Sequence, residues 1–203
     1  MFKNFLALNQ QDLLDHLMLT AYISEFAEWD NRAHLERIRR YAYLLASGTE
    51  MVHNEASLIS IAAILHDIGK ITIPVSILKK TANLEPIEYK ITEQHTLEGA
   101  RLLSGSGSPI LQTGEIIART HHERWDGSGY PDGLKGEAIP LSGRITALAD
   151  VFDALTTKRS YKTRVQPEAA LELIKESSGS LFDARLVSIM VNKFEDFRSV
   201  LRI

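Results

Sequence analysis

The sequence predicts an all-α protein that folds as a single helical bundle. Apolar residues recur at helical rather than strand spacing along nearly the whole chain. With 203 residues, of which 44% are hydrophobic, the chain is large enough for one well-buried core and small enough to have only one. The breaks between the expected helices are short apart from one long loop at residues 126–140, and there is no internal repeat, so we expect no linker between domains.

The elements follow in order from the apolar spacing and its interruptions. Residues 1–29 are expected to form a lead-in helix, and residues 30–203 the main domain. Glycines, prolines and a polar tract divide the chain into about eight helices. The apolar positions of the first two helices are Leu13, Leu14, Leu17, Met18 and Ala21, then Ile38, Tyr41 and Leu45. The breaks are Gly48 with Asn54, Gly69 with Pro74, Pro86, residues 104–109, residues 127–143, Pro167 and Gly179.

Composition excludes several classes of function. The chain has 23 basic and 26 acidic residues and a net charge of -3, so no overall field attracts a nucleic-acid polymer or an anionic membrane. It has no cysteine, which excludes disulfides, thiolate zinc sites and a cysteine nucleophile. Metals could be bound only by histidine, carboxylate and water, a set that favours iron or manganese over structural zinc.

No membrane or secretory segment is expected. The longest apolar stretch, residues 59–65, is far shorter than the roughly 20 residues of a membrane span. The N-terminal residues lack the apolar region of a signal peptide. We therefore expect the protein to be cytoplasmic.

Histidines carry the main functional signal. Five of the seven fall at inward-facing or helix-end positions, which independent core histidines would seldom do. Each alone has an ordinary explanation, as a packed core histidine or as a favourable cation at a helix C-terminus. The five are His34, His66, His95, His121 and His122.

His66 and Asp67 follow the apolar run LISIAAIL and precede Gly69. They are expected in the last turn of a buried helix, with Gly69 as its cap. A buried carboxylate needs a cation, and a metal is a better partner for Asp67 than a distant Lys70 alone. A salt bridge at the helix end remains an equal alternative.

The other candidates lie on separate helices. His95 is expected to face inward on the stripe of Ile87, Ile91, Glu98 and Leu102, with Gly99 allowing another backbone to approach. His121 and His122 close a helix, and His34 shares a helix face with Asp30. Asp150 and Asp153 lie in RITALADVFDAL, which has hardly any polar face, so both carboxylates need partners.

Several helices that each supply one or two ligands form the usual di-metal site of a helical bundle. Two metals about 3.5–4 Å apart can bridge a hydroxide and clamp an in-line phosphoryl displacement. Lys70, Arg159 and Lys162 would supply positive charge for phosphate oxygens. Arg159 and Lys162 are equally explained as surface cations.

The motifs closely resemble those of HD-GYP domains, a branch of the HD metal-dependent phosphohydrolases. The resemblance covers roughly residues 30–182. It rests on several long motifs in the family's order: HLERI, LHDIGKITIP, HTLEG, HHERWDGSGYPDGLKGEAIP, RITALADVFDAL and RSYK.

The resemblance implies a binuclear or trinuclear iron or manganese centre, other divalent metals being possible. It also implies hydrolysis of cyclic di-GMP to linear pGpG, and often on to GMP, by a metal-bridging hydroxide. Asp67 and Lys70 would be catalytic. The implied core metal ligands are His66, Asp67 (bridging), His95, His121, His122 and Asp150.

Further positions match the family in part. His34 and Asp30 match the ligands of a third metal, although trinuclear members carry Glu where this chain has the shorter Asp30. Lys70, Arg159 and Lys162 match phosphate-contacting positions. The GYP loop, with Asp126, Gly127, Gly129, Tyr130 and Pro131, matches the motif near the substrate and a surface for GGDEF-type or other signalling proteins.

Two alternatives stay open. One is an HD phosphohydrolase acting on another nucleotide. The other is a slow module that binds cyclic di-GMP and reports to a protein partner. The intact GYP loop disfavours the first, and the complete set of core ligands disfavours the second.

Overall fold

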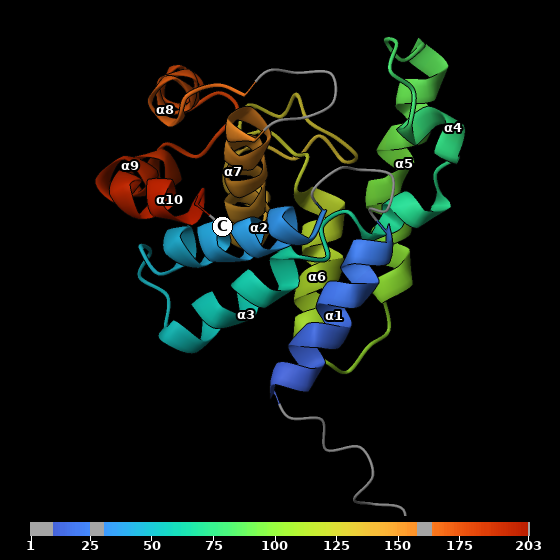
Figure 1. The fold of residues 1–203 in the computed structure, drawn as a ribbon, viewed down its shortest axis with the longest axis horizontal. Coiled ribbons are helices and arrows are strands. Elements are labelled where there is room, and N and C mark those ends of the chain that lie inside the picture. The colour runs from blue at the N-terminus through green and yellow to red at the C-terminus, as the bar shows by residue number, and fades with distance from the viewer. Residues whose placement is uncertain (1–9, 25–30, 158–163, 203) are drawn as a thin grey trace, which may run out of the picture.

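The computed structural model describes residues 10–24, 31–157 and 164–202 (Figure 1). These residues form ten α-helices and two short 3₁₀ helices, and no β-strand occurs among them, which confirms the all-α prediction. The elements are α1 (Gln10–Ser24), α2 (Asn31–Ala46), α3 (His53–Ala63), η1 (Ile68–Thr72), α4 (Val75–Leu78), α5 (Pro86–Leu103), α6 (Pro109–Thr120), η2 (Gly136–Ala138), α7 (Leu141–Thr156), α8 (Pro167–Glu176), α9 (Ala184–Asn192) and α10 (Phe194–Val200).

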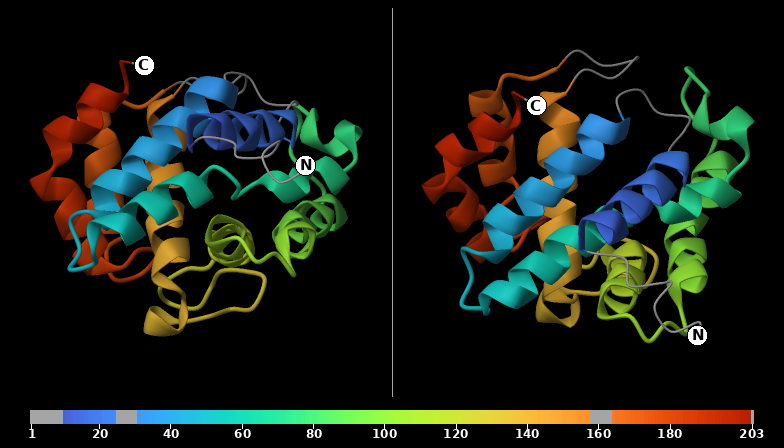
Figure 2. Two further views of the ribbon diagram at one scale, coloured as in Figure 1. Left: turned by 90° about the horizontal axis from the view of Figure 1, so that it is seen from below. Right: turned by 60° about the horizontal axis from the view of Figure 1, so that its bottom comes forward.

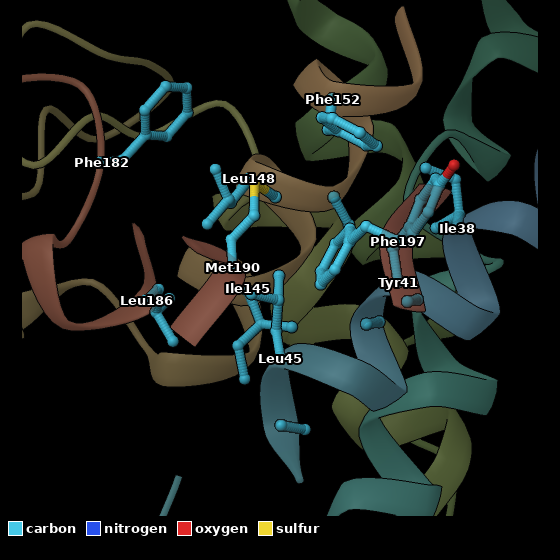
Figure 3. Packing of buried hydrophobic residues seen from close by; sticks show 14 of the residues in the cluster. Ile38, Tyr41, Leu45, Ile145, Leu148, Phe152, Phe182, Leu186, Met190 and Phe197 are labelled. Carbon is cyan, nitrogen blue, oxygen red and sulfur yellow. The ribbon is translucent and has the colours of Figure 1, made fainter. Parts of the chain in front are cut away.

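The main core lies where α2 and α7 meet the C-terminal helices (Figure 3). The expected stripe of α2 is fully buried there, since Ile38, Tyr41 and Leu45 each have no exposed surface. The ring of Tyr41 stacks on Phe197 with centroids 5.1 Å apart and meets Phe152 edge-on at 5.3 Å. Such aromatic contacts add to the free energy gained from apolar burial. This core fixes α2 against α7, the two helices that carry His34 and Asp150.

A second apolar cluster lies under α1. Ala21 is fully buried, and Leu14, Leu17 and Met18 pack partly buried against the cluster, but Leu13 of the expected stripe is exposed. The predicted boundary between a lead-in helix and the main domain, at residues 29 and 30, lies outside the described residues and stays a prediction.

Helix α5 departs from its expected orientation. The stripe that was expected to face inward is wrong, because Ile87 is 64% and Leu102 48% exposed. His95 is buried, which confirms its predicted inward orientation, and the other buried positions are Thr96, Gly99, Ala100 and Leu103. The reason is that α6 and η1 pack on one side of α5. Figure 2 (left) shows α5 and α6 side by side and nearly end-on.

The helix count is higher than the sequence breaks predict. Helix α4 is a single turn, and α9 and α10 are separated at Lys193 without a glycine or proline. A helix boundary that contains no glycine or proline cannot be predicted from the positions of these residues. Among the described helices, none combines the length and apolarity that crossing a membrane requires.

Candidate metal centre

The candidate ligands come together from five places in the fold. Helix α2 contributes His34, and α5 contributes His95. The turn after α3 supplies His66 and Asp67, the end of α6 supplies the two adjacent histidines, and α7 supplies Asp150. All six core residues that the sequence predicted, together with His34, thus converge. They are His66, Asp67, His95, His121, His122 and Asp150.

The first group of ligands surrounds one oxygen of Asp67. Asp67 Oδ1 lies 3.1 Å from His95 Nε2 and 3.6 Å from His121 Nε2. His122 completes the group, in which the potential ligand atoms all lie within 4.8 Å of one another. Three histidines and one carboxylate are a common ligand set for a first-row transition metal.

The second group adjoins the first through the other oxygen of Asp67. It consists of His34, His66 and Asp150, again with ligand atoms within 4.8 Å of one another. His66 Nε2 lies 3.3 Å from Asp67 Oδ2 and 4.0 Å from Asp150 Oδ1. The carboxylate of Asp67 therefore faces histidines of both groups.

Hydrogen bonds fix the protonation of four histidine rings. Nδ1 of His34 donates to Asp153 Oδ2 at 2.7 Å. Backbone carbonyl oxygens accept from Nδ1 in the other three: Ala63 for His66 (2.9 Å), Thr92 for His95 (2.6 Å) and Ile117 for His121 (3.0 Å). A neutral imidazole with its proton on Nδ1 carries a lone pair on Nε2, which is the arrangement that metal-binding histidines use.

This arrangement fits a bound cation. His95 Nε2 and His121 Nε2 lie 3.5 Å apart, and both bear lone pairs. Asp67 Oδ1, beside them, is buried and makes no hydrogen bond with any described residue. Electron-rich atoms that converge in a buried space repel one another unless a positive charge lies between them. The donor set of imidazole and carboxylate suits a divalent transition metal.

The electrostatics keep the ligands in their binding forms. Burial lowers the pKa of His121, and burial together with His121 and His95 lowers the pKa of His122 well below its usual value. Burial alone would raise the pKa of Asp67, but Lys70 and His66 bring it well below its usual value. His121 and His122 are therefore neutral and the Asp67 carboxylate is ionised near neutral pH, as metal ligands must be.

Two expectations about this segment are wrong. Helix α3 ends at Ala63, so His66 and Asp67 lie in the following turn, and Gly69 lies within η1 instead of capping a helix. Lys70 is not distant from Asp67, because the 3₁₀ turn brings its Nζ to 2.6 Å from Asp67 Oδ2. An ion pair and a candidate metal position thus share one carboxylate.

Two glycines bring η1 against α5. A Cβ at Gly69 would lie 2.5 Å from the backbone nitrogen of Gly99, and one at Gly99 would lie 3.2 Å from the nitrogen of Gly69. The sequence expectation that Gly99 allows a close backbone approach is confirmed. This contact places Asp67 opposite His95.

The GYP loop folds back over the end of α6. A Cβ at Gly129 would lie within 2.5 Å of the backbone of His122 and Glu123. The Tyr130 ring stacks on His122 with centroids 4.8 Å apart, and its backbone N–H donates to the His122 carbonyl. Gly127 has φ +86, a conformation that glycine adopts readily. The side chain of Asp126 accepts from the Ser128 N–H, and the Tyr130–Pro131 peptide is cis.

Some predicted residues cannot be placed and some contributors were missed. Asp30, Arg159 and Lys162 lie outside the described residues. Arg37 was missed: its Nε donates to Asp153 Oδ1 at 2.6 Å, completing the partners that the buried Asp153 needs. Glu123 was also missed, although its place directly after the two histidines was a signal.

An apolar pocket of about 200 Å³ adjoins His121 and His122 and is bounded by α7 and α8.

Comparison with known proteins identifies the family. A family model described as the HD domain matches residues 16–186, which is most of the chain. The chain belongs to the HD domain family. With the motifs described above, the match confirms the resemblance to HD-GYP domains.

Curated relatives of this HD domain are named for cyclic-dinucleotide hydrolysis. It is 43% identical over 190 residues to a cyclic di-GMP phosphodiesterase of Thermotoga maritima, covering 94% of this chain and 52% of the relative. It is 46% identical over 167 residues to the cyclic di-GMP phosphodiesterase response regulator RpfG of Xanthomonas campestris, covering 82% and 44%. A 3'3'-cGAMP-specific phosphodiesterase 2 of Vibrio cholerae is 42% identical over 168 residues, covering 83% and 32%. The chain thus spans about half or less of these relatives.

A solved structure shares the fold of the HD domain. A cyclic GMP-AMP specific phosphodiesterase of Vibrio cholerae aligns with a TM-score of 0.65 at 23% identity, covering 92% of this chain and 50% of the other. At this identity the likeness supports the fold alone.

Proposed function

We propose that this HD domain is a metal-dependent phosphodiesterase that hydrolyses cyclic di-GMP to linear pGpG, to GMP or to both. The observation that carries the proposal is the Asp67 carboxylate, which faces histidines of two adjacent ligand groups. The names of relatives from Thermotoga maritima and Xanthomonas campestris support the substrate.

The two groups would hold two divalent metal ions, iron or manganese. Asp67, His95, His121 and His122 would hold one ion, and His34, His66 and Asp150 the other. When bound, two such ions lower the pKa of water and neutralise negative charge on the phosphoryl group in the transition state. A third ion would need Asp30 beside His34, and that position lies outside the described residues. The proposal is therefore a centre of at least two ions.

Asp67 is proposed as the bridging ligand. Its two oxygens point in different directions, Oδ1 toward His95 and His121 and Oδ2 toward His66. Its lowered pKa keeps both oxygens unprotonated at neutral pH. Asp67 would thus offer a donor atom to each ion, and the two ions would supply positive charge for an in-line displacement.

Lys70 is proposed as the residue that handles the substrate phosphate and the leaving oxygen. Its Nζ lies 2.6 Å from Asp67 Oδ2, at the edge of the ligand groups. An ammonium has three N–H donors, so Nζ can keep the Asp67 contact and still donate to a phosphoryl oxygen. The same group can give its proton to the departing ribose oxygen. Arg159 and Lys162 remain proposed as further phosphate contacts.

The proposal extends to the surroundings of the reaction. We place it in the cytoplasm, where a bacterial nucleotide second messenger would be met. The GYP loop is proposed as a contact surface for GGDEF-type or other signalling proteins, because Asp126 and the neighbouring Ser128 and Asp132 are exposed.

A second candidate substrate is 3'3'-cGAMP. The observation that favours it is the 42% identity to a 3'3'-cGAMP-specific phosphodiesterase of Vibrio cholerae, which is nearly as high as the identity to the cyclic di-GMP enzymes. The two dinucleotides differ in one base, so residues around the pocket beside His121 and His122 would decide between them.

The test is turnover by anaerobically purified protein loaded with Fe(II) or Mn(II), using cyclic di-GMP and 3'3'-cGAMP separately. The double variant His66→Ala, Asp67→Ala should lose turnover of both. His53→Ala, at an exposed histidine outside the ligand groups, should keep it. Equal rates for the wild type and the double variant would overturn the metal-centre assignment. Binding of cyclic di-GMP without turnover would support a signalling module instead.

A further inference from the structure

We propose that Glu123 is a positioning residue that orients the His122 ligand through the GYP loop. Its carboxylate is almost fully buried, with 3% of the residue exposed. Oε1 accepts from the backbone N–H of Asp132 at 2.7 Å, and Oε2 accepts from that of Leu134 at 3.0 Å. Both oxygens therefore bind the limb of the loop that directly follows Tyr130 and Pro131. A buried carboxylate that accepts two backbone amides makes strong, charge-assisted hydrogen bonds.

The ring of His122 needs such an anchor because no hydrogen bond within the described residues fixes its orientation. Four other histidines of the centre have Nδ1 fixed by a carbonyl or carboxylate oxygen. The His122 ring, in contrast, makes no hydrogen bond with any residue that the structure describes. It is held by neighbouring rings: those of His121 (4.1 Å), Tyr130 (4.8 Å) and His95 (5.0 Å). Of these, only Tyr130 belongs to a loop.

Apart from the close packing of Gly129 on the backbone of residues 122–124, the loop makes few other polar contacts near Tyr130. The Tyr130 N–H bonds to the His122 carbonyl at a long 3.3 Å. Asp132 forms a bidentate ion pair with Arg119 (2.7 and 2.8 Å), but both side chains are substantially exposed. Exposed ion pairs contribute little to stability. The buried Glu123 carboxylate is thus the principal anchor of the limb that carries Tyr130.

Substitution of a residue that orients a metal ligand from outside the coordination sphere commonly lowers metal affinity by about 10-fold or more. The inference rests on the proposed metal centre but not on its substrate. Mn(II) affinity, measured by calorimetric titration of the anaerobic protein, is therefore the readout.

Glu123→Gln keeps the size of the side chain but turns an NH₂ group toward one backbone N–H. We expect Mn(II) affinity to fall about tenfold. Asp132→Asn is the matched control, because it removes the exposed ion pair and keeps the backbone amide that Glu123 binds. It should stay within about twofold of the wild type. Trypsin should also cleave after the exposed Lys135 faster in Glu123→Gln than in the control.

A second pair of variants tests the route through Tyr130. Tyr130→Phe retains the ring on His122 and should keep wild-type Mn(II) affinity, whereas Tyr130→Ala should lose about as much as Glu123→Gln. The double variant Glu123→Gln, Tyr130→Ala should be no weaker than either single variant, because residues acting through one route are not additive.

The outcomes separate the two proposals. Wild-type Mn(II) binding without hydrolysis of either dinucleotide contradicts the proposed function and leaves the inference standing. Unchanged Mn(II) affinity in Glu123→Gln, even with a lower melting temperature, overturns the inference. If that variant does not fold, equal affinities for Tyr130→Phe and Tyr130→Ala overturn it instead. A wild type that binds no divalent metal overturns both.

Discussion

A Cβ atom at Gly69 would lie 1.9 Å from the backbone carbonyl oxygen of His95. Gly69 comes two residues after Asp67, and the carbonyl belongs to a candidate ligand on another helix. The backbone contact between η1 and α5 therefore sets the 3.1 Å separation of His95 Nε2 and Asp67 Oδ1. Backbone atoms cannot rotate away as a side chain can, so this part of the centre has little freedom to adjust.

Gly69→Ala should destabilise the protein by about 3 kcal/mol, because overpacking against fixed backbone forces η1 and α5 apart. Urea unfolding of the metal-free protein measures the change. Gly107→Ala is the control, since a Cβ there would meet nothing within 4 Å. If both variants unfold at the same urea concentration, the close contact has no energetic importance.

Divalent metal should stabilise the folded protein. At a metal concentration about 100 times the dissociation constant, the gain is about 2.7 kcal/mol. The melting temperature should therefore rise when Mn(II) is added to protein treated with chelator. His95→Ala should abolish most of the rise, and His53→Ala, at an exposed position, should preserve it. The same rise in both variants would show that the ion binds elsewhere.

Tyr41→Phe should raise the free energy of unfolding by about 1 kcal/mol, because a buried polar group without a partner costs about that much or more. The hydroxyl of Tyr41 is buried and makes no hydrogen bond with the described residues. Its stacking on Phe197 would be retained. Tyr43→Phe is the comparison, since the Tyr43 hydroxyl bonds to His53. A loss of stability in Tyr41→Phe would contradict this account.

Asp183 should make stability depend on acid pH. Burial would raise its pKa, but the bonds from Arg185 and Arg144 bring the pKa below its usual value. A carboxylate whose pKa is lower in the folded state stabilises the protein above its unfolded pKa of about 3.9, and the effect is lost as the pH falls through the folded value. Unfolding free energies measured between pH 7 and pH 2 should therefore fall less steeply for Asp183→Asn than for the wild type. Asp196→Asn, at an exposed position of α10, is the control variant.

The sequence predicted the fold class and the convergence of the candidate ligands because both depend on the spacing of residue types along the chain. Ile38, Tyr41 and Leu45 lie on one face of a helix, and all three are buried when that face packs on the core. Histidines that face inward on separate helices of one bundle are expected to converge in its interior. The orientation of α5 escaped prediction, since apolar spacing does not show that Ile87 and Leu102 lack a neighbouring helix to cover them.

The contributors that sequence reasoning missed act through tertiary contacts. Arg37 pairs with Asp153 across 116 positions of sequence. The carboxylate of Glu123 binds backbone amides, so no partner side chain in the sequence points to it, and its only signal is its place directly after His121 and His122. Lys70 itself is predicted, but its proximity to Asp67 is not, because the sequence favours a helix end at Gly69 where the structure has a 3₁₀ turn.

The His34–Asp153 hydrogen bond joins residues that are 119 positions apart. During synthesis, the N-terminal part of the centre thus leaves the ribosome long before the α7 residues that complete it. Closing so long a loop carries a large entropic cost until the core between α2 and α7 has formed. The proposed metal centre would then be complete only after α2 and α7 have packed together, so its formation would be a late step of folding.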